Sequence, residues 1–323
     1  MNNDLTSLRD PIDESLLKQD GHQLNSQGGR CYPSINGVPR FVDSDNYSED
    51  FGDQWNRFPK TQLDSFNGFD HSQTRLARCL HGDLKNLAGK KILEAGSGAG
   101  RFTEILLKYD AIVHSFDYSK AVEANAKNNG HHKNLLLVQA DIRNIPFPKE
   151  SYDYVICLGV LQHTPNPEES IKSLWAMLKP GGFLIIDHYI WKWRLILPPP
   201  FGNPENIFRQ IVLRIPKKNR FGFIKRLTDF WFPWHWMFKD SLWIQKIFRR
   251  FSPIHFYYPE IKLRDRHMYY EWSLLDTHDA LTDFYKHRRK PDQIRTFLEH
   301  IGGQDIVVEV GGNGVEAICR KKI

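Results

Sequence analysis

The sequence has few cysteines, and none of them lie close together. Its four cysteines are Cys31, Cys79, Cys157 and Cys319, and no two of them form a C-x-x-C pair. A disulfide framework or a structural zinc site needs paired or closely spaced cysteines. We therefore expect reduced thiols and no metal. Cys157 lies in an apolar run, which predicts a buried thiol rather than a nucleophile.

Long apolar stretches are also missing. No run approaches the roughly 20 apolar residues that a membrane-spanning helix needs. Residues 1–11 carry acids and amides where a signal peptide would have its apolar segment. We therefore expect a cytoplasmic protein, and contact with the inner membrane surface stays open.

The positive charge is concentrated in one region. The net charge is +6, but residues 189–270 hold 16 Lys and Arg against 5 Asp and Glu, whereas residues 1–60 hold 6 against 10. Residues 190–270 also contain six of the nine tryptophans. This basic, aromatic region must face an acidic partner or form a solvent-exposed rim.

Strand and helix patterns alternate along the middle of the chain and resume near its end. Short apolar runs predict strands at 91–95, 111–117, 134–140, 152–159, 183–189, 305–310 and 314–320. Helical patterns lie between them at 101–109, 119–129 (with Ser119 as N-cap), 167–178 (closing at Lys-Pro-Gly-Gly182) and 291–301. This alternation predicts an α/β fold with a doubly wound, mostly parallel seven-stranded sheet and an antiparallel C-terminal hairpin, plus a helical, aromatic insertion. The expected parts are an arm at 1–69, a core at 70–189, the insertion at 190–290, and a helix and hairpin at 291–323 that complete the sheet.

A glycine-rich loop follows the first core strand. It reads Glu94-Ala-Gly96-Ser-Gly98-Ala-Gly100. Glycines allow a positive φ and let a ligand approach the backbone. The third glycine comes one residue earlier than in the G-x-G-x-x-G loops that hold a pyrophosphate. The spacing therefore favours a ligand other than a dinucleotide.

Acidic residues mark three successive strand ends. Asp117 ends the second strand, 17 residues after Gly100, where a carboxylate can accept both hydroxyls of a ribose. Asp141 follows the third strand, where it can accept from an adenine amino group, and Glu94 lies at the first strand end, facing a ligand ammonium. Each acid alone is as well explained by a solvated turn or a helix cap. Three together favour a binding site at the carboxyl edge of the sheet.

These motifs resemble those of class I S-adenosylmethionine (SAM)-dependent methyltransferases. The pieces are ILEAGSGAGRF, the acid in HSFDYS, QADIRNIPFP, FPKESYDYVICLGVLQHTPNPEESI and LKPGGFLIID. The resemblance covers residues 90–189, and the final hairpin fits it. It implies SAM as cofactor, with the backbone near Gly159 closing the pocket. It implies these cofactor-binding residues: Glu94, Gly96, Gly98, Gly100, Asp117, Asp141, Ile142 and Leu158.

The N-terminal arm resembles a different element. CYPSINGVPRFV followed by DNYSEDFGDQWNRF is similar to the tail of a zinc-ribbon-like segment found ahead of some bacterial methyltransferases. Only Cys31 remains here, so the resemblance implies a metal-free remnant or lid. Asn36-Gly37 predicts a hairpin turn. Trp55 and Arg57 are candidates to cover the cofactor.

Histidine is the side chain best suited to act as a general base at neutral pH. His163 follows the fourth core strand and is the first candidate, although it could equally pack or hydrogen-bond its own loop. His188 and Tyr189 follow the fifth strand and are second candidates, with Asp187 placed to orient either one.

The insertion has three interpretations. Residues 240–251 place Trp243, Ile247, Phe248 and Phe251 on one helical face and basic residues on another, and residues 206–215 are similar. Ordinary packing of a lid against the sheet is the plainest reading. The same pattern suits a membrane surface with anionic lipid. Nucleic-acid binding is the third reading, but no RNA-binding module is recognisable.

The resulting hypothesis is an enzyme that transfers a methyl group from SAM to an oxygen, or else a nitrogen, of an acceptor. A small molecule, a lipid-linked intermediate or a surface-glycan precursor would serve as that acceptor. The alternatives are an RNA (tRNA or rRNA) methyltransferase and a catalytically silent SAM-binding subunit. The sequence does not fix the acceptor or the oligomeric state.

Overall fold

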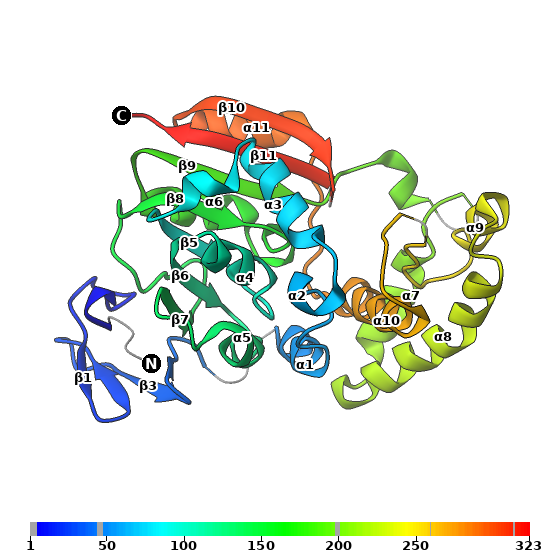
Figure 1. Cartoon of the computed structure of the whole chain (residues 1–323), viewed down its shortest axis with the longest axis horizontal. Coiled ribbons are helices and arrows are strands. Elements are labelled where there is room, and N and C mark those ends of the chain that lie inside the picture. Colours follow the sequence, from blue (N-terminus) through cyan, green and yellow to red (C-terminus); the bar gives the residue numbers. More distant parts are fainter. Residues whose placement is uncertain (1–4, 44–47, 198–200, 259, 313) are drawn as a thin grey trace.

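A seven-stranded sheet forms the centre of the molecule (Figure 1). The computed structural model describes residues 5–43, 48–197, 201–258, 260–312 and 314–323. Within them the strand order is β10-β11-β9-β8-β5-β6-β7. The strands are β5 (Lys91–Ala95), β6 (Ile112–Asp117), β7 (Leu135–Gln139), β8 (Tyr152–Cys157), β9 (Leu178–His188), β10 (Gly303–Gly311) and β11 (Gly314–Lys321).

Strand direction follows the prediction. The pairs from β7 through β6, β5 and β8 to β9 are all parallel, and β11 is antiparallel to both β9 and β10. The predicted parallel sheet with an antiparallel C-terminal hairpin is therefore confirmed. Asn313, in the predicted hairpin turn, lies outside the described residues.

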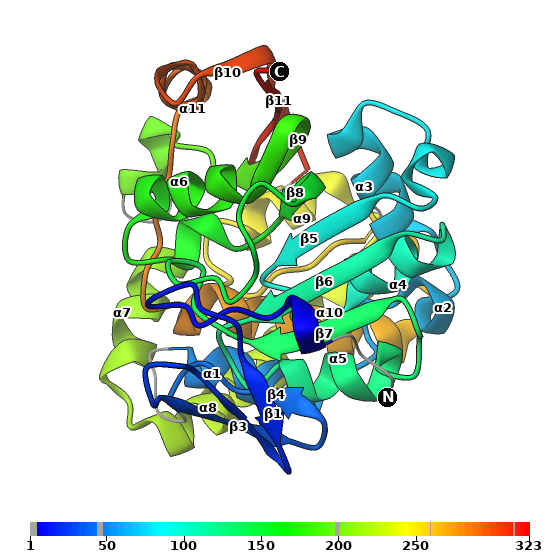
Figure 2. The same ribbon diagram turned by 90° about the vertical axis from the view of Figure 1, so that its left-hand side faces the viewer.

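Helices cover both faces of the sheet, as a doubly wound fold requires (Figure 2). One buried core joins the sheet to α3, α4 and α5, and the other joins it to α6 and α11. These helices are α3 (His71–Leu80), α4 (Arg101–Lys108), α5 (Val122–Asn129), α6 (Pro167–Met177) and α11 (Pro291–His300). Helix α6 begins where its sequence dictates, because Asn166 accepts from the Glu169 amide at 3.2 Å and Pro167 occupies the first turn.

Two local predictions were wrong. Ser119 is not the N-cap of α5, which begins at Val122 after Ala121: the Ser119 hydroxyl donates to Asp117 and accepts from the Ala121 amide, before the helix begins. Lys-Pro-Gly-Gly182 does not separate a helix from a strand, because β9 already begins at Leu178. Leu178 pairs with Tyr152 and Phe183 with Tyr154, so the glycines form an irregularity within the strand.

The N-terminal arm forms a small sheet of its own beside β7 (Figures 1 and 2). Its strands are β1 (Lys18–Asp20), β2 (Gln23–Asn25), β3 (Cys31–Ile35) and β4 (Val38–Pro39), paired in that order. The hairpin at Asn36-Gly37 is confirmed, since both residues have positive φ between β3 and β4. Residues 1–4 and 44–47 of the arm lie outside the described ranges, and its likeness to a zinc ribbon stays a prediction.

The insertion packs mainly on itself. It contains α7 (Glu205–Arg214), α8 (Lys217–Met237), α9 (Leu242–Phe248) and α10 (Arg266–Thr282). Two apolar clusters lie among these helices, one around Phe232 and Trp272 and the other around Val212 and Leu281. In Figure 1 this group stands to one side of the sheet, and α10 meets α1 (Glu49–Arg57) of the N-terminal arm. The plainest reading of the sequence was that the insertion packs against the sheet. The structure shows that it packs mainly on itself and also contacts the N-terminal arm.

Candidate active site

A cavity of about 890 Å³ lies where the core strands end and the insertion begins. One part of its wall comes from the loops after β5, β6, β7 and β8, and the other comes from α1, α10 and the segments around them. A volume of this size is typical of ligand sites. The cavity therefore joins the predicted binding edge to a second chamber lined by the insertion.

Two glycines in the cavity wall allow other side chains to pack directly against the backbone of the glycine loop. Gly96 and Gly98 both have positive φ, at 75° and 53°. A Cβ on Gly96 would lie 2.2 Å from Val160 Cγ2, and one on Gly98 would lie 3.2 Å from the Trp55 ring. The loop conformation and the closeness of these side chains thus both require glycine. Trp55 lies over the loop, as expected, whereas Arg57 does not line the cavity and stacks on Phe221.

Asp117 anchors the same loop. Its Oδ2 accepts from the Gly98 amide at 2.9 Å, and its Oδ1 accepts from the Ser119 amide and hydroxyl at 2.8 and 2.7 Å. Burial raises the pKa of Asp117, and these three donors oppose that rise. A carboxylate has about four acceptor positions, so about one remains for a ribose hydroxyl rather than the two that we predicted.

The next two loops complete this part of the wall. Asp141, Ile142 and Leu158 line the cavity, as predicted. Asp141 is paired with Arg143, whose Nη2 donates to it at 2.6 Å. Gly159 also lines the cavity.

Asp187 has a different role from the one predicted. Its Oδ1 accepts from the Gly159 amide at 2.6 Å, and its Oδ2 pairs with Arg75. It therefore fixes the loop after β8 rather than orienting His188 or Tyr189. Arg75 itself lines the cavity.

Two predicted cofactor residues lie outside the cavity lining. Glu94 is 2% exposed, and its Oε2 accepts from Thr103 and Ser115 beneath the loop. Burial raises the pKa of Glu94 to about 7. Gly100 faces Asn125, whose Oδ1 lies 2.3 Å from the position of a Cβ. Direct ligand contact by Glu94 or Gly100 is therefore not supported, and both residues shape the loop from behind.

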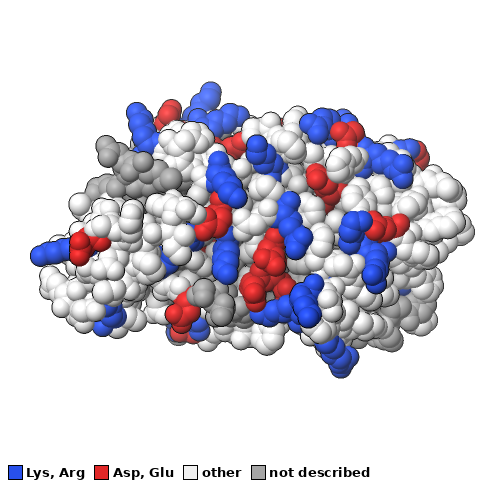
Figure 3. All heavy atoms as spheres, turned by 90° about the horizontal axis from the view of Figure 1, so that it is seen from below, with Lys and Arg blue, Asp and Glu red and all other residues white. Residues whose placement is uncertain are grey.

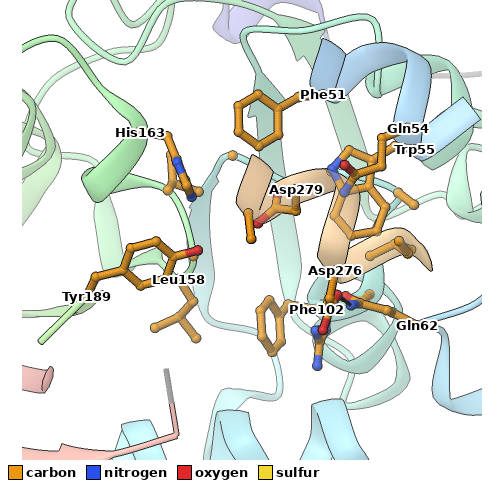
Figure 4. A pocket seen from close by; sticks show the side chains of 18 of the residues that line it. Phe51, Gln54, Trp55, Gln62, Phe102, Leu158, His163, Tyr189, Asp276 and Asp279 are labelled. Carbon is orange, nitrogen blue, oxygen red and sulfur yellow. Dashed lines mark hydrogen bonds between the residues drawn. The ribbon is translucent and has the colours of Figure 1, made fainter. Parts of the chain in front are cut away.

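The three candidate catalytic residues separate into two groups. His163 and Tyr189 line the cavity with their rings 5.3 Å apart, whereas His188 is buried and does not line it (Figure 4). Burial lowers the pKa of His163 to about 4, although its Nδ1 lies 3.6 Å from Asp283. Burial also raises the pKa of Tyr189 well above its usual value. Both side chains are therefore neutral near pH 7, and His188 is not placed to act as a base.

Helix α10 supplies site residues that the sequence analysis missed. Asp276 and Asp279 both line the cavity, together with His255 and Tyr257 from the preceding segment. The only signal was the spacing of Asp276, Asp279 and Asp283, which places three acids on one face of α10 and its C-terminal end. No sequence feature near these aspartates indicates that this helix face lies opposite the carboxyl ends of the core strands.

The lining also contains what a cationic amino acid nucleoside such as SAM needs. Its methionine carboxylate requires cations, and Arg75 and Arg101 line the cavity near the glycine loop. Arg75 Nε and Ser97 Oγ are buried without a hydrogen-bond partner, so each offers an unused donor. Within the described residues, no group of three or more His, Cys, Asp or Glu is arranged to hold a metal ion.

Comparison with known proteins identifies the core. Residues 93–186 match the family model described as "Methyltransferase domain". The chain is 35% identical over 100 residues to a ubiquinone biosynthesis O-methyltransferase from Coxiella burnetii, and 35% identical over 101 residues to one from Pseudomonas fluorescens. Each match covers 30% of this chain and 43% of the relative, so the chain spans less than half the length of these relatives.

Solved structures show a broader but weaker similarity. Magnesium protoporphyrin IX methyltransferase from Synechocystis, with bound SAH, is 17% identical, with a TM-score of 0.45 over 85% of this chain and 97% of that one. A SAM-dependent methyltransferase from Aquifex aeolicus is 14% identical, with a TM-score of 0.41 over 77% and 88%. The motifs, the strand order and the family match together confirm the sequence-based assignment: residues 93–186 are a class I methyltransferase domain whose cofactor is SAM.

Proposed function

We propose that this protein transfers a methyl group from SAM to an oxygen of a small-molecule acceptor. One observation carries the proposal: a single cavity joins the glycine loop to a chamber walled by the insertion. A methyl transfer needs two reactants held in line and shielded from water. A continuous two-part cavity meets that need.

The core residues would hold the cofactor. Asp117 accepts from the ribose, Asp141 and Ile142 contact the adenine, and Arg75 and Arg101 pair with the carboxylate. Bound SAM supplies an activated methyl group, so the protein mainly has to position the acceptor. Trp55, over Gly98, excludes water from this side.

The insertion would hold the acceptor. Its chamber is lined by aromatic and acidic side chains: Phe51 and Trp55 of α1, Tyr189, Tyr257, Asp276 and Asp279. The names of the relatives favour oxygen over nitrogen as the accepting atom. The chamber size favours a small molecule or the head of a lipid-linked or glycan precursor.

Titration calorimetry and a transfer assay test this proposal. We expect SAM and S-adenosylhomocysteine to bind in the micromolar range, and methyl-labelled SAM to transfer its label to an extract of a strain that lacks this protein. Comparison of metabolites between that strain and its parent then identifies the acceptor, because the compound in the deletion strain is lighter by one CH₂ than its methylated counterpart in the parent. SAM binding without any transfer would instead indicate a catalytically silent subunit.

We also propose that the insertion contacts anionic membrane. The outer face of the insertion, formed by the exposed side of α8, α9 and the turn after α9, carries seven large apolar side chains, and Trp243 is 71% exposed. The residues of this outer face are Phe230, Trp234, Met237, Leu242, Trp243, Ile247 and Phe251. Lys246, Arg249 and Arg250 lie among them along the chain, and Figure 3 shows Lys and Arg side chains bordering uncharged surface at this end of the molecule. Apolar side chains beside cations suit the interface of an anionic bilayer. Every described helix is too short or too polar to cross a bilayer.

Vesicle flotation tests this contact. We expect the protein to float with phosphatidylglycerol-containing vesicles and not with pure phosphatidylcholine. The double variant W243S/I247S should lose flotation. V310S, which removes an exposed apolar side chain from β10, away from the insertion, should retain it. Equal flotation of both variants would exclude the outer face as the contact.

A further inference from the structure

One carboxylate in the acceptor chamber has no hydrogen-bond or ion-pair partner within the described part of the chain. Asp276, Asp279 and Asp283 share one face of α10 and its end. Asp283 pairs with Arg209 at 2.5 Å and Lys286 at 3.0 Å. Asp276 accepts from Gln62 Nε2 and from Trp272 Nε1, both at 3.1 Å. Among the described residues, none donates to the carboxylate of Asp279 or forms an ion pair with it.

Asp279 points into the cavity. Figure 4 places its carboxylate between His163 and Tyr189 on one side and Trp55 on the other. The charged and titratable groups around it come from several elements, and they are Asp276, Asp283, Lys286, His255, Tyr189, Tyr257, His163 and Glu205.

These surroundings control its protonation. Burial comes first in raising the pKa of Asp279 to about 7, and the carboxylates of Asp283 and Asp276 add to the rise. Lys286 and His255 oppose it. Lys286 is largely engaged elsewhere, because it also pairs with Glu205 at 2.6 Å. Asp279 therefore exchanges its proton near neutral pH.

We propose that Asp279 is the general base of the methyl transfer and takes the proton from a phenolic hydroxyl of the acceptor. This inference rests on the function proposed above. The proton of the acceptor O–H passes to the carboxylate, while an oxygen lone pair forms the O–CH₃ bond. The C–S bond breaks, its electron pair stays on sulfur, and the neutral thioether product leaves. The carboxyl proton then returns to solvent.

The other candidates are less suited to this role. A base works best when its pKa lies near the working pH. His163, with a pKa of about 4, is a much weaker base than Asp279, and Tyr189 holds its proton too tightly. Both can instead line the chamber against the acceptor ring.

The strength of the base selects the acceptor. A phenol ionises near pH 10, as tyrosine does, about three units above Asp279. An alkyl hydroxyl resembles water, with a pKa of about 15.7, and lies beyond the reach of this carboxylate. Aromatic walls at Phe51, Trp55 and Tyr257 also match a flat ring.

Two catechols of different acidity test the proposal. The rate of methyl transfer to catechol and to 4-nitrocatechol is measured between pH 5 and 9 for wild type, D279N and E271Q. Glu271 lies on the same helix and does not line the cavity, so E271Q is the matched control. Calorimetry with SAM is run on all three proteins.

Wild type and E271Q should show a catechol rate that rises with pH and levels off near pH 7. D279N should bind SAM with wild-type affinity. Its rate of methyl transfer to catechol should fall at least about 100-fold, which is the usual contribution of a general base. The same variant should approach wild-type rates with 4-nitrocatechol at pH 8, because that hydroxyl is already ionised. A folding defect in D279N would lower both rates and would also weaken SAM binding, so calorimetry distinguishes it from loss of the base.

Each other outcome refutes one part of the proposal: the base, the acceptor class or the proposed function. An undiminished D279N rate with the same pH profile, or equal losses with both catechols at unchanged SAM affinity, refutes Asp279 as the base. SAM binding without methylation of either catechol by wild type refutes the phenolic acceptor. Failure of wild type to bind SAM refutes the proposed function itself.

Discussion

Glu94 makes the stability of this protein depend on pH in a direction opposite to that of most carboxylates. The side chain is buried beneath the glycine loop, and no described residue donates a hydrogen bond to its Oε1. Two hydroxyls, from Thr103 and Ser115, donate to Oε2 but do not offset the burial. The pKa therefore rises from 4.5 to about 7 on folding.

The sign follows from proton binding. Between pH 4.5 and about 7 the folded protein holds a proton on Glu94 that the unfolded chain has lost. The contribution of this group to stability is therefore complete below pH 4.5 and is lost as the pH rises through about 7. This rise in pKa corresponds to about 3 kcal/mol in total, most of which falls between pH 5 and pH 8.

Glu94→Gln removes this dependence while keeping the shape of the side chain. The free energy of unfolding is measured by urea denaturation of wild type and variant at pH 5, 6, 7 and 8. We expect the free energy of unfolding of the variant to rise by roughly 2 to 3 kcal/mol relative to wild type between pH 5 and pH 8. Other titrating groups are shared by both proteins, so they cancel in the difference. A difference that stays constant with pH would refute this account of Glu94.

Further predictions concern the cavity. Asp117→Ala should weaken SAM binding more than tenfold by calorimetry, because it removes both a ribose acceptor and the anchor of the Gly98 amide; unchanged affinity would exclude it from the site. Gly96→Ala should also weaken SAM binding at least tenfold, since its Cβ would lie 2.2 Å from Val160 at a positive φ, and wild-type affinity would show that the loop can move aside. Asp276→Asn should shift the rising limb of the catechol pH profile to lower pH, because it removes a negative charge that raises the pKa of Asp279; a shift to higher pH would contradict that assignment.

The sheet could be read from the sequence because its signals are local. Strands β5 and β7 are short apolar runs, buried along nearly their whole length, and each ends at residues that turn the chain. The glycines and Asp117 lie next to their strands in the sequence, so their place at the sheet edge followed from the strands themselves. The Lys-Pro-Gly-Gly182 segment misled because backbone pairing with β8 overrode its local preference for a turn.

The acceptor side could not be read in the same way. Asp279 lies 185 residues after Glu94, and its position depends on how α10 packs against α1 and the end of β9. His163 was favoured because histidine usually titrates near neutral pH, but that expectation holds only for a solvated ring. Burial, which the sequence does not reveal, lowers the pKa of the histidine and raises that of the aspartate.

Two half-buried aspartates illustrate how the two walls of the cavity differ. Asp117 receives one hydrogen bond from the Gly98 amide in the glycine loop and two from Ser119, and these stabilise the charged form that a ribose contact requires. Asp279 receives none and faces two further carboxylates, so its charged and neutral forms are close in free energy near pH 7. The same side chain is therefore suited to holding a ligand in one wall and to exchanging a proton in the other. Supplying a donor to Asp279, for example through A280S if the new hydroxyl reaches it, should lower its pKa and its strength as a base. The catechol rate would then fall while the 4-nitrocatechol rate held, and a rate increase with catechol would contradict this division between the two walls.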